Sequence, residues 1–171
     1  MKQYVRTILD YPIKGIKFRD ITPLLQSREL FSKVIQDMSK PWENAEVDVI
    51  VGIESRGFIF AGAMAHCLGA AFVPLRKPNK LPYDTYSVEY DLEYGQTEMH
   101  IHRDALDDAT NILIVDDLLA TGGTALAAIE LIQRFEAKNI LGAGFVINLP
   151  ELGGFKKLQA KRLPVDYLMK F

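Results

Sequence analysis

The chain of 171 residues is 49% hydrophobic and 25% charged, a composition typical of one globular domain, which we expect to span residues 1–171. A net charge of -2 and a pI near 5.9 argue against a nucleic-acid surface, so any anion site must concentrate basic residues locally. A single cysteine excludes an internal disulfide, and the first ten residues hold no apolar run of signal-peptide length, so we expect a cytoplasmic protein.

The N-terminal part combines a helical segment with a loop. Ser27 to Met38 predicts a helix, and Tyr11 to Pro23, with two prolines and a glycine, predicts an ordered loop rather than a regular element. Phe18 lies in this loop between Lys17 and Arg19, an unusual position for a core aromatic. Such a ring can stack on a planar ligand whose edge the neighbouring backbone reads, or it can anchor the loop to the domain.

A first strand–loop–helix unit follows. Val47 to Ile53 predicts a central strand, which ends in Glu54-Ser55-Arg56-Gly57. The apolar segment Phe58 to Leu75 approaches the length of a membrane span, but a glycine and a proline interrupt it. We therefore expect no membrane span but a buried helix followed by a buried strand: Phe58 to Leu68 and Ala71 to Leu75.

Basic residues gather where these two strands end. Arg56 follows the first strand, and Arg76, Lys77 and Lys80 follow the second on a segment stiffened by two prolines. Arginine forks onto phosphate oxygens in a fixed geometry, so this group of cations favours a pyrophosphate-like ligand. The alternatives are a solvent-facing salt bridge between Arg56 and Glu54, and a solvated loop.

The next stretch is rich in tyrosine and acidic residues. Gly95-Gln96 lies between two short runs, Tyr86 to Tyr90 and Thr97 to Ile101, which predicts a hairpin or flap over a site, outside the parallel core. His100 and His102 would share one strand face, but no third metal ligand accompanies them. We expect these histidines to be structural or exposed.

The most informative stretch begins with Ile112 to Val115, which predicts a strand buried on both faces. Asp116 and Asp117 follow, where such a strand would leave the core. Ala120 to Thr124 is a loop of small residues and threonines, and a helical pattern begins at Ala125. The unpaired N–H groups and the dipole of a helix N-terminus attract anions, and two glycines let the backbone approach a phosphate closely.

The acidic pair limits the classes of ligand that this stretch could bind. Carboxylates beside a phosphate would repel it unless they face sugar hydroxyls or a divalent cation, which indicates a metal-bound sugar phosphate with free hydroxyls. The alternative is an ordinary turn with two solvated aspartates. No lysine follows Gly123, which excludes a P-loop, and Ile147 replaces the third glycine of a dinucleotide fingerprint.

The C-terminal part completes the alternation of strands and helices. Ile140 to Ile147 predicts a strand, Glu151 to Gly154 a turn, and Lys156 to Lys161 a short surface helix. The alternation predicts an α/β fold, a doubly wound, mostly parallel sheet flanked by helices. In such sheets ligands bind at the carboxyl ends of the strands, where the motifs from Glu54 onward gather.

The segment Asp116 to Thr124 resembles the 5-phosphoribosyl-1-pyrophosphate (PRPP) motif of type I phosphoribosyltransferases. Further segments, in family order and spacing, extend the resemblance to the adenine-specific members: Pro12 to Pro23, Glu54 to Gly57, Arg76-Lys77 and Leu92 to Gly95. Lys14 departs from the pattern, because many members have a second proline there. The resemblance implies a small N-terminal hood over about residues 1–45 and a flexible β-hairpin flap over about residues 78–101.

The resemblance implies the conversion of adenine and PRPP to AMP and pyrophosphate by a homodimer. Mg²⁺ would be bound through PRPP, with no direct metal ligand from the chain. An enzyme acting on xanthine or on hypoxanthine and guanine is the nearest alternative. A PRPP-sensing regulator without catalysis is another, although the N-terminal segment is not notably basic.

The resemblance also implies ligand-binding roles for individual residues. Phe18 would stack on adenine, and the backbone of Lys17 and Arg19 would read its edge. Asp116 and Asp117 would bind the ribose hydroxyls. The remaining roles belong to the phosphate groups: Ala120, Thr121, Gly122, Gly123 and Thr124 for the 5′-phosphate, and Arg56, Arg76, Lys77 and Lys80 for the pyrophosphate.

Two flap residues complete the implied site. Tyr94 would close over it. Hypoxanthine–guanine members carry an aspartate three residues after the acidic pair, where this chain has Ala120, so the catalytic carboxylate would be Glu93. The family also often has a strained turn at Glu54-Ser55, sometimes with a cis peptide bond.

Overall fold

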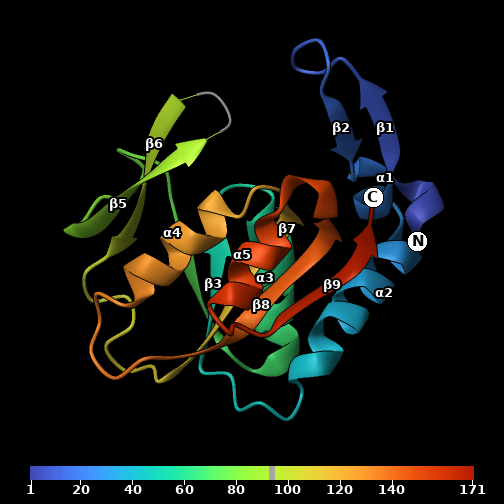
Figure 1. Ribbon diagram of the computed structural model, residues 1–171. Coiled ribbons are helices and arrows are strands. Elements are labelled where there is room, and N and C mark those ends of the chain that lie inside the picture. The colour runs from blue at the N-terminus through green and yellow to red at the C-terminus, as the bar shows by residue number, and fades with distance from the viewer. Residues whose placement is uncertain (93–94) are drawn as a thin grey trace.

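A computed structural model describes residues 1–92 and 95–171 (Figure 1). Its centre is a five-stranded, all-parallel sheet in the order β4-β3-β7-β8-β9, and the two antiparallel hairpins β1–β2 and β5–β6 lie outside this sheet. The strands are β1 (Arg6–Leu9), β2 (Lys17–Asp20), β3 (Val49–Ile53), β4 (Ala71–Leu75), β5 (Thr85–Leu92), β6 (Gly95–His102), β7 (Asn111–Leu119), β8 (Asn139–Asn148) and β9 (Val165–Lys170).

Helices cover both faces of the sheet, as the predicted doubly wound fold requires. One buried cluster joins α2 and α3 to one face, and a second joins α4 and α5 to the other. The α-helices are α1 (Thr22–Gln26), α2 (Arg28–Ser39), α3 (Gly57–Leu68), α4 (Gly123–Ile132) and α5 (Gly154–Ala160), and the 3₁₀ turns are η1 (Lys2–Tyr4), η2 (Lys40–Trp42) and η3 (Pro150–Leu152).

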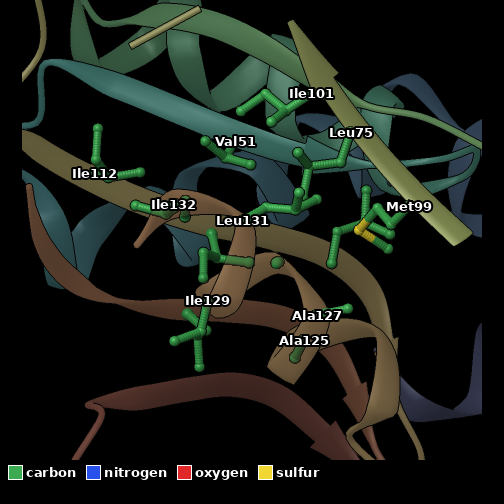
Figure 2. Packing of buried hydrophobic residues seen from close by; sticks show 14 of the residues in the cluster. Val51, Leu75, Met99, Ile101, Ile112, Ala125, Ala127, Ile129, Leu131 and Ile132 are labelled. Carbon is green, nitrogen blue, oxygen red and sulfur yellow. The ribbon is translucent and has the colours of Figure 1, made fainter. Parts of the chain in front are cut away.

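The central strands supply side chains to both layers. Val49, Val51 and Ile53 of β3 belong to the cluster under α4, whereas Ile50 packs under α3. This alternation follows from the two-residue period of a strand. Figure 2 shows the α4 side, where Val51 lies among residues of the helix. Burying each such side chain stabilises the fold by about 1.5–3 kcal/mol.

The segment that approached the length of a membrane span divides into α3 and β4, as the sequence predicts. Gly69 ends α3 in the left-handed conformation, with φ 67°. Within residues 1–92 and 95–171, no helix is long and apolar enough to cross a membrane.

The predicted hairpin is present as β5 and β6, but its strands are longer than predicted. Gly95 and Gln96 begin β6 instead of separating the two strands. The base of the hairpin packs into the core through Met99 and Ile101, both labelled in Figure 2. Figure 1 shows this hairpin and β1–β2 rising at the same end of the sheet, on opposite sides of the molecule.

The predicted loop from Tyr11 to Pro23 is wrong in its second half. Lys17–Asp20 forms β2, which pairs antiparallel with Arg6–Leu9, and α1 begins at Thr22. Strand β1 is exposed along its whole length and β2 is mostly half-buried, so neither carries the alternation of buried and exposed residues by which a strand is recognised. The edge strand β9, which the sequence analysis also missed, is mostly half-buried and likewise gives a weak signal.

Candidate active site

A cavity of about 150 Å³ lies at the carboxyl end of β7. Asp116 and Asp117 line one part of it, and the following loop with the start of α4 lines another. The loop residues that border the cavity are Ala120, Thr121, Gly122 and Thr124. The structure therefore brings together the two halves of the central motif, at the end of the sheet where α/β proteins bind ligands.

The acidic pair lies inside β7, and the expectation that it follows the strand is wrong. The neighbouring β8 is long enough to extend the pairing, with Asp116 opposite Phe145 and Leu119 opposite Asn148. The exposed fractions of Asp116 and Asp117 are only 8% and 6%. The alternative of two solvated aspartates is therefore also wrong.

Burial dominates the electrostatics of the pair. Desolvation and then the neighbouring charge of Asp117 hold the pKa of the Asp116 carboxyl well above its usual range. Desolvation also raises the pKa of Asp117, although the Arg56 guanidinium acts in the opposite direction. Asp116 Oδ1 accepts a hydrogen bond from the Asp117 backbone N–H at 2.8 Å. Carboxylates held in this way are suited to accept hydrogen bonds from ligand hydroxyls.

The N-terminus of α4 is open to an anion. Its N-cap is Gly122, which has φ 82° and offers no side-chain hydrogen bond to the first turn. Because the first N–H groups of a helix have no partner inside the helix, those of Gly123 and Thr124 can donate to a ligand. Helix α4 starts two residues earlier than the apolar pattern from Ala125 indicated.

Arg56 connects the acidic pair to the N-terminal hairpin. Its Nη2 lies 2.7 Å from Asp117 Oδ2, an ion pair in which no N–H is aligned for a hydrogen bond with that oxygen. Its guanidinium carbon lies 5.1 Å from the centre of the Phe18 ring, in cation–π contact. The alternative of a salt bridge from Arg56 to Glu54 is wrong. The Glu54–Ser55 peptide bond is cis, as the resemblance implied.

Glu54 instead organises the basic segment after β4. One carboxylate oxygen, Oε2, accepts from the Lys77 backbone N–H at 2.8 Å and from Arg76 Nε at 3.3 Å. Partial burial alone would raise the pKa of Glu54, but these contacts outweigh it and the pKa is lowered. Arg76 also donates to the Lys80 carbonyl at 3.3 Å, which folds the segment back on itself.

The basic segment is also joined to the flap. The backbones of Arg76 and His100 exchange hydrogen bonds of 3.0 and 2.8 Å. The His100 ring contacts Thr85 Oγ1 at 3.2 Å and Glu98 Oε2 at 2.8 Å, which agrees with the expected structural role of this histidine. Among the residues described, no group of three histidine, cysteine, aspartate or glutamate side chains is arranged to hold a metal ion.

The three predicted base-binding residues occupy successive positions of β2, and their environments differ. Phe18 is half-buried and contacts both Arg56 and, edge-on at 5.1 Å, Tyr11. The guanidinium carbon of Arg19 lies 4.6 Å from the centre of the Phe171 ring, and Lys17 is exposed. For Lys17 and Arg19, only the backbone remains a candidate for binding a base.

The two predicted flap residues, Glu93 and Tyr94, lie outside the described residues. Two glycines that the sequence analysis did not single out belong to the site. A Cβ on Gly57, at the start of α3, would lie 2.7 Å from Asp116 Oδ1, so only glycine fits there. A Cβ on Gly154 would lie 2.4 Å from the Ala120 carbonyl oxygen, in the loop that follows β7. In the sequence each of them is only a glycine that follows a turn at the end of a strand. That position does not show which residue the glycine contacts.

A parallel sheet with a buried acidic pair followed by an open helix N-terminus is an arrangement suited to a protein that binds a phosphorylated sugar. The model of the phosphoribosyl transferase domain matches residues 21–164. The adenine phosphoribosyltransferase of Beijerinckia indica is 49% identical over 171 residues, covering 100% of this chain and 95% of that protein.

Solved structures of adenine phosphoribosyltransferases are also similar to this chain. The adenine phosphoribosyltransferase of Rhodothermus marinus has a TM-score of 0.92 at 45% identity, covering 99% of this chain and 96% of its own. That of Saccharomyces cerevisiae, complexed with an imino-altritol bisphosphate and adenine, has a TM-score of 0.89 at 38% identity, covering 98% of this chain and 95% of its own. The chain belongs to the adenine phosphoribosyltransferase family and is a pentosyl-transferring enzyme of purine salvage.

Proposed function

We propose that this enzyme transfers the phosphoribosyl group of PRPP to adenine, forming AMP and pyrophosphate, with the central motif binding the sugar phosphate and Phe18 binding the base. The observation that carries the proposal is the chain of contacts from Phe18 through Arg56 to Asp117. It connects a ring suited to a purine with carboxylates suited to a ribose. The yeast relative described as complexed with adenine supports the same base.

The 5′-phosphate binds at the start of α4. The N–H groups of Gly123 and Thr124, with the Thr121 and Thr124 hydroxyls, donate to its oxygens. The charge–dipole attraction is worth only about 0.3–2 kcal/mol, so most of the affinity comes from several hydrogen bonds made together. Asp116 and Asp117 accept hydrogen bonds from the ribose hydroxyls; Asp117 Oδ2 pairs with Arg56 but accepts no hydrogen bond from the part of the chain that the structure describes, which leaves it able to accept one from the ligand.

The basic segment holds the leaving group. Displacement at the anomeric carbon develops positive charge on the ribose, while negative charge accumulates on the departing pyrophosphate. Arg76, Lys77 and Lys80, together with Arg56, stabilise that negative charge. Glu54 keeps the segment in position through the Lys77 backbone N–H and the Arg76 guanidinium.

Mg²⁺ fits this site through the substrate. The ion would be bound through the oxygens of PRPP, and Asp117 Oδ2, which has no hydrogen-bond partner among the described residues, would accept a hydrogen bond from a water of the ion. When bound there, the ion neutralises charge on the leaving pyrophosphate. The attacking purine loses its imidazole proton, and Glu93 accepts it or stabilises the developing charge, with Tyr94 closing the flap.

The enzyme works as a homodimer in the cytoplasm, where its single cysteine stays reduced. An apolar face supports the dimer: Ile59 of α3 is 41% exposed and Phe72 of the edge strand β4 is 38% exposed. Light scattering should give the mass of two chains for the wild type and of one chain for Phe72→Glu. A monomeric wild type would contradict this assembly.

A panel of bases, each assayed with PRPP and Mg²⁺, tests the reaction. Adenine should be turned over at least a hundredfold more efficiently than hypoxanthine, guanine or xanthine. If a 6-oxopurine is turned over most efficiently, that base and not adenine is the substrate. PRPP binding without turnover of any base would indicate a sensor instead of an enzyme.

A further inference from the structure

The first residue of α5 lies directly against the loop that follows β7. The buried Gly154 donates its N–H to the Ala120 carbonyl at 3.0 Å. A Cβ placed on Gly154 would lie 2.4 Å from that carbonyl oxygen and 2.7 Å from the Gly122 nitrogen. A Cβ on Gly122 would lie 3.0 Å from Gly154 Cα, so the two backbones touch with no room for a side chain on either.

This contact determines which polar groups the loop can present. Because the Ala120 carbonyl accepts from Gly154, this acceptor is not free to turn toward a bound anion. Gly122, in the left-handed conformation, then directs the chain into α4 with the first N–H groups of the helix unpaired. A loop without this support could rotate its peptide groups and set carbonyl oxygens against a phosphate.

Helix α5 is itself fixed to the sheet. Phe155 packs edge-on against Tyr167 of β9, with ring centres 5.6 Å apart, and Leu158 is fully buried. The strand ends below the loop are joined as well, because Leu149 N–H donates to the Leu119 carbonyl at 2.9 Å. The loop therefore rests on a support that is anchored independently of any ligand.

We propose that Gly154 is a positioning residue for the 5′-phosphate: its missing side chain and its N–H hold residues 120–124 in the anion-binding shape. The inference rests on the proposed function, because it takes these residues as the phosphate site. It adds a role for Gly154, which lies about thirty residues beyond the motif in the chain.

The variant Gly154→Ala tests the inference. Ribose 5-phosphate and pyrophosphate, titrated separately by calorimetry, report on the two anion sites. We expect ribose 5-phosphate to bind at least tenfold more weakly, with pyrophosphate affinity changed less than twofold. A merely structural role would instead lower the melting temperature and weaken both ligands alike. Equal ribose 5-phosphate affinity in variant and wild type would overturn the inference.

Gly153→Ala is the matched control. A Cβ at Gly153 meets nothing within 4 Å, but φ is +79°, so the substitution strains the backbone without intruding on the loop. We expect a lower melting temperature and unchanged ribose 5-phosphate affinity. If Gly153→Ala weakens ribose 5-phosphate binding as much as Gly154→Ala does, general destabilisation explains the effect and the inference is overturned.

A second pair of variants covers the case in which Gly154→Ala does not fold. Phe155→Ala removes the anchor of α5 without touching the loop, and Phe135→Ala removes a comparable edge-on contact with Tyr86, 5.4 Å between ring centres. Only Phe155→Ala should weaken ribose 5-phosphate, at least threefold; equal effects of the two would overturn the inference. A wild type that neither binds ribose 5-phosphate nor turns over adenine would instead refute the proposed function.

Discussion

The Arg56 guanidinium lies over the Phe18 ring, 5.1 Å from its centre, and joins the N-terminal hairpin to the central sheet. The same group reaches Asp117 Oδ2 at 2.7 Å. One side chain thus contacts both the ring proposed for the base and the carboxylate proposed for the ribose. The two reacting parts of the substrates would meet beside this arginine.

The first prediction concerns this double contact. Arg56→Lys should lower kcat/KM for PRPP at least tenfold, equivalent to about 1.4 kcal/mol of transition-state stabilisation. A lysine keeps the charge but lacks the planar fork that stacks on a ring and pairs with a carboxylate at once. Steady-state kinetics with PRPP varied at saturating adenine measures the change. Arg134→Lys, at an exposed position in the turn after α4, is the control, and a wild-type rate for Arg56→Lys would remove Arg56 from the site.

The second prediction concerns Phe18. Phe18→Leu keeps an apolar side chain of similar size but removes the flat ring, so KM for adenine should rise roughly 2- to 10-fold, as expected when one aromatic stacking interaction is removed. Binding of PRPP in the absence of adenine should not change. Tyr11→Leu alters the aromatic that touches Phe18 edge-on and should change KM for adenine less. Equal effects would identify Phe18 as a structural anchor of the hairpin, the alternative that the sequence left open.

The sequence could predict the doubly wound sheet and the place of the site, because buried strands and helices carry strong periodic signals. Ala71–Leu75 forms a strand at the predicted residues. Tertiary pairing, however, decides the rest. Lys17–Asp20 becomes a strand only because Arg6–Leu9 lies beside it, and the acidic pair is buried only because β8 extends past Phe145. The residues of one segment, taken alone, predict neither the pairing of Lys17–Asp20 nor the burial of the acidic pair.

The same limit applies within the site. The cations were visible in the sequence, but their partners were not: Arg56 pairs with Asp117, which lies 61 positions away in the chain, and Glu54 holds the Arg76 segment. Gly154 is an ordinary turn glycine until the loop after β7 is placed against it. Close approaches between segments that are distant in the chain can be recognised only in the three-dimensional structure.

The third prediction uses the burial of Asp116. Asp116→Asn should raise the melting temperature of the ligand-free protein by a few degrees at pH 7, because it removes a charge that desolvation disfavours. The amide oxygen can still accept from the Asp117 N–H. At the same pH, PRPP affinity should fall, because an amide oxygen is a weaker acceptor for ribose hydroxyls than a carboxylate. Asp108→Asn, on an exposed residue, should change neither quantity.

The difference in stability between Asp116→Asn and the wild type should depend on pH, because the pKa of Asp116 is raised in the folded protein. An unfolded aspartate titrates near pH 4, at about 3.9. Since the pKa of Asp116 is raised in the folded protein, the free energy of unfolding is highest below that value and falls as the pH rises toward the folded-state pKa. The advantage of Asp116→Asn should therefore shrink toward zero as the pH falls to about 4, measured by thermal unfolding across the range. An advantage that grows on acidification would contradict the raised pKa.

The fourth prediction concerns Phe171, whose ring lies 4.6 Å from both Lys2 Nζ and the Arg19 guanidinium carbon. These contacts attach the N-terminal hairpin to the end of β9. Phe171→Leu should destabilise the hairpin by about 0.5–1 kcal/mol for each exposed cation–π interaction that it removes. Hydrogen exchange of residues 17–20 should become faster, and KM for adenine should rise with KM for PRPP unchanged. Tyr4→Leu is the matched aromatic control; a response as large as that of Phe171→Leu would make the effect nonspecific.

The fifth prediction concerns the proton of the attacking purine. Glu93→Gln should lower kcat at least tenfold, and by up to the 10²- to 10⁴-fold typical of general acid–base catalysis, with PRPP affinity little changed. Glutamine keeps the size and hydrogen-bonding reach of the side chain but cannot accept the proton. Glu89→Gln, four positions earlier on the exposed side of β5, is the matched control, and it should retain the wild-type rate. Wild-type turnover in Glu93→Gln would remove Glu93 from this step.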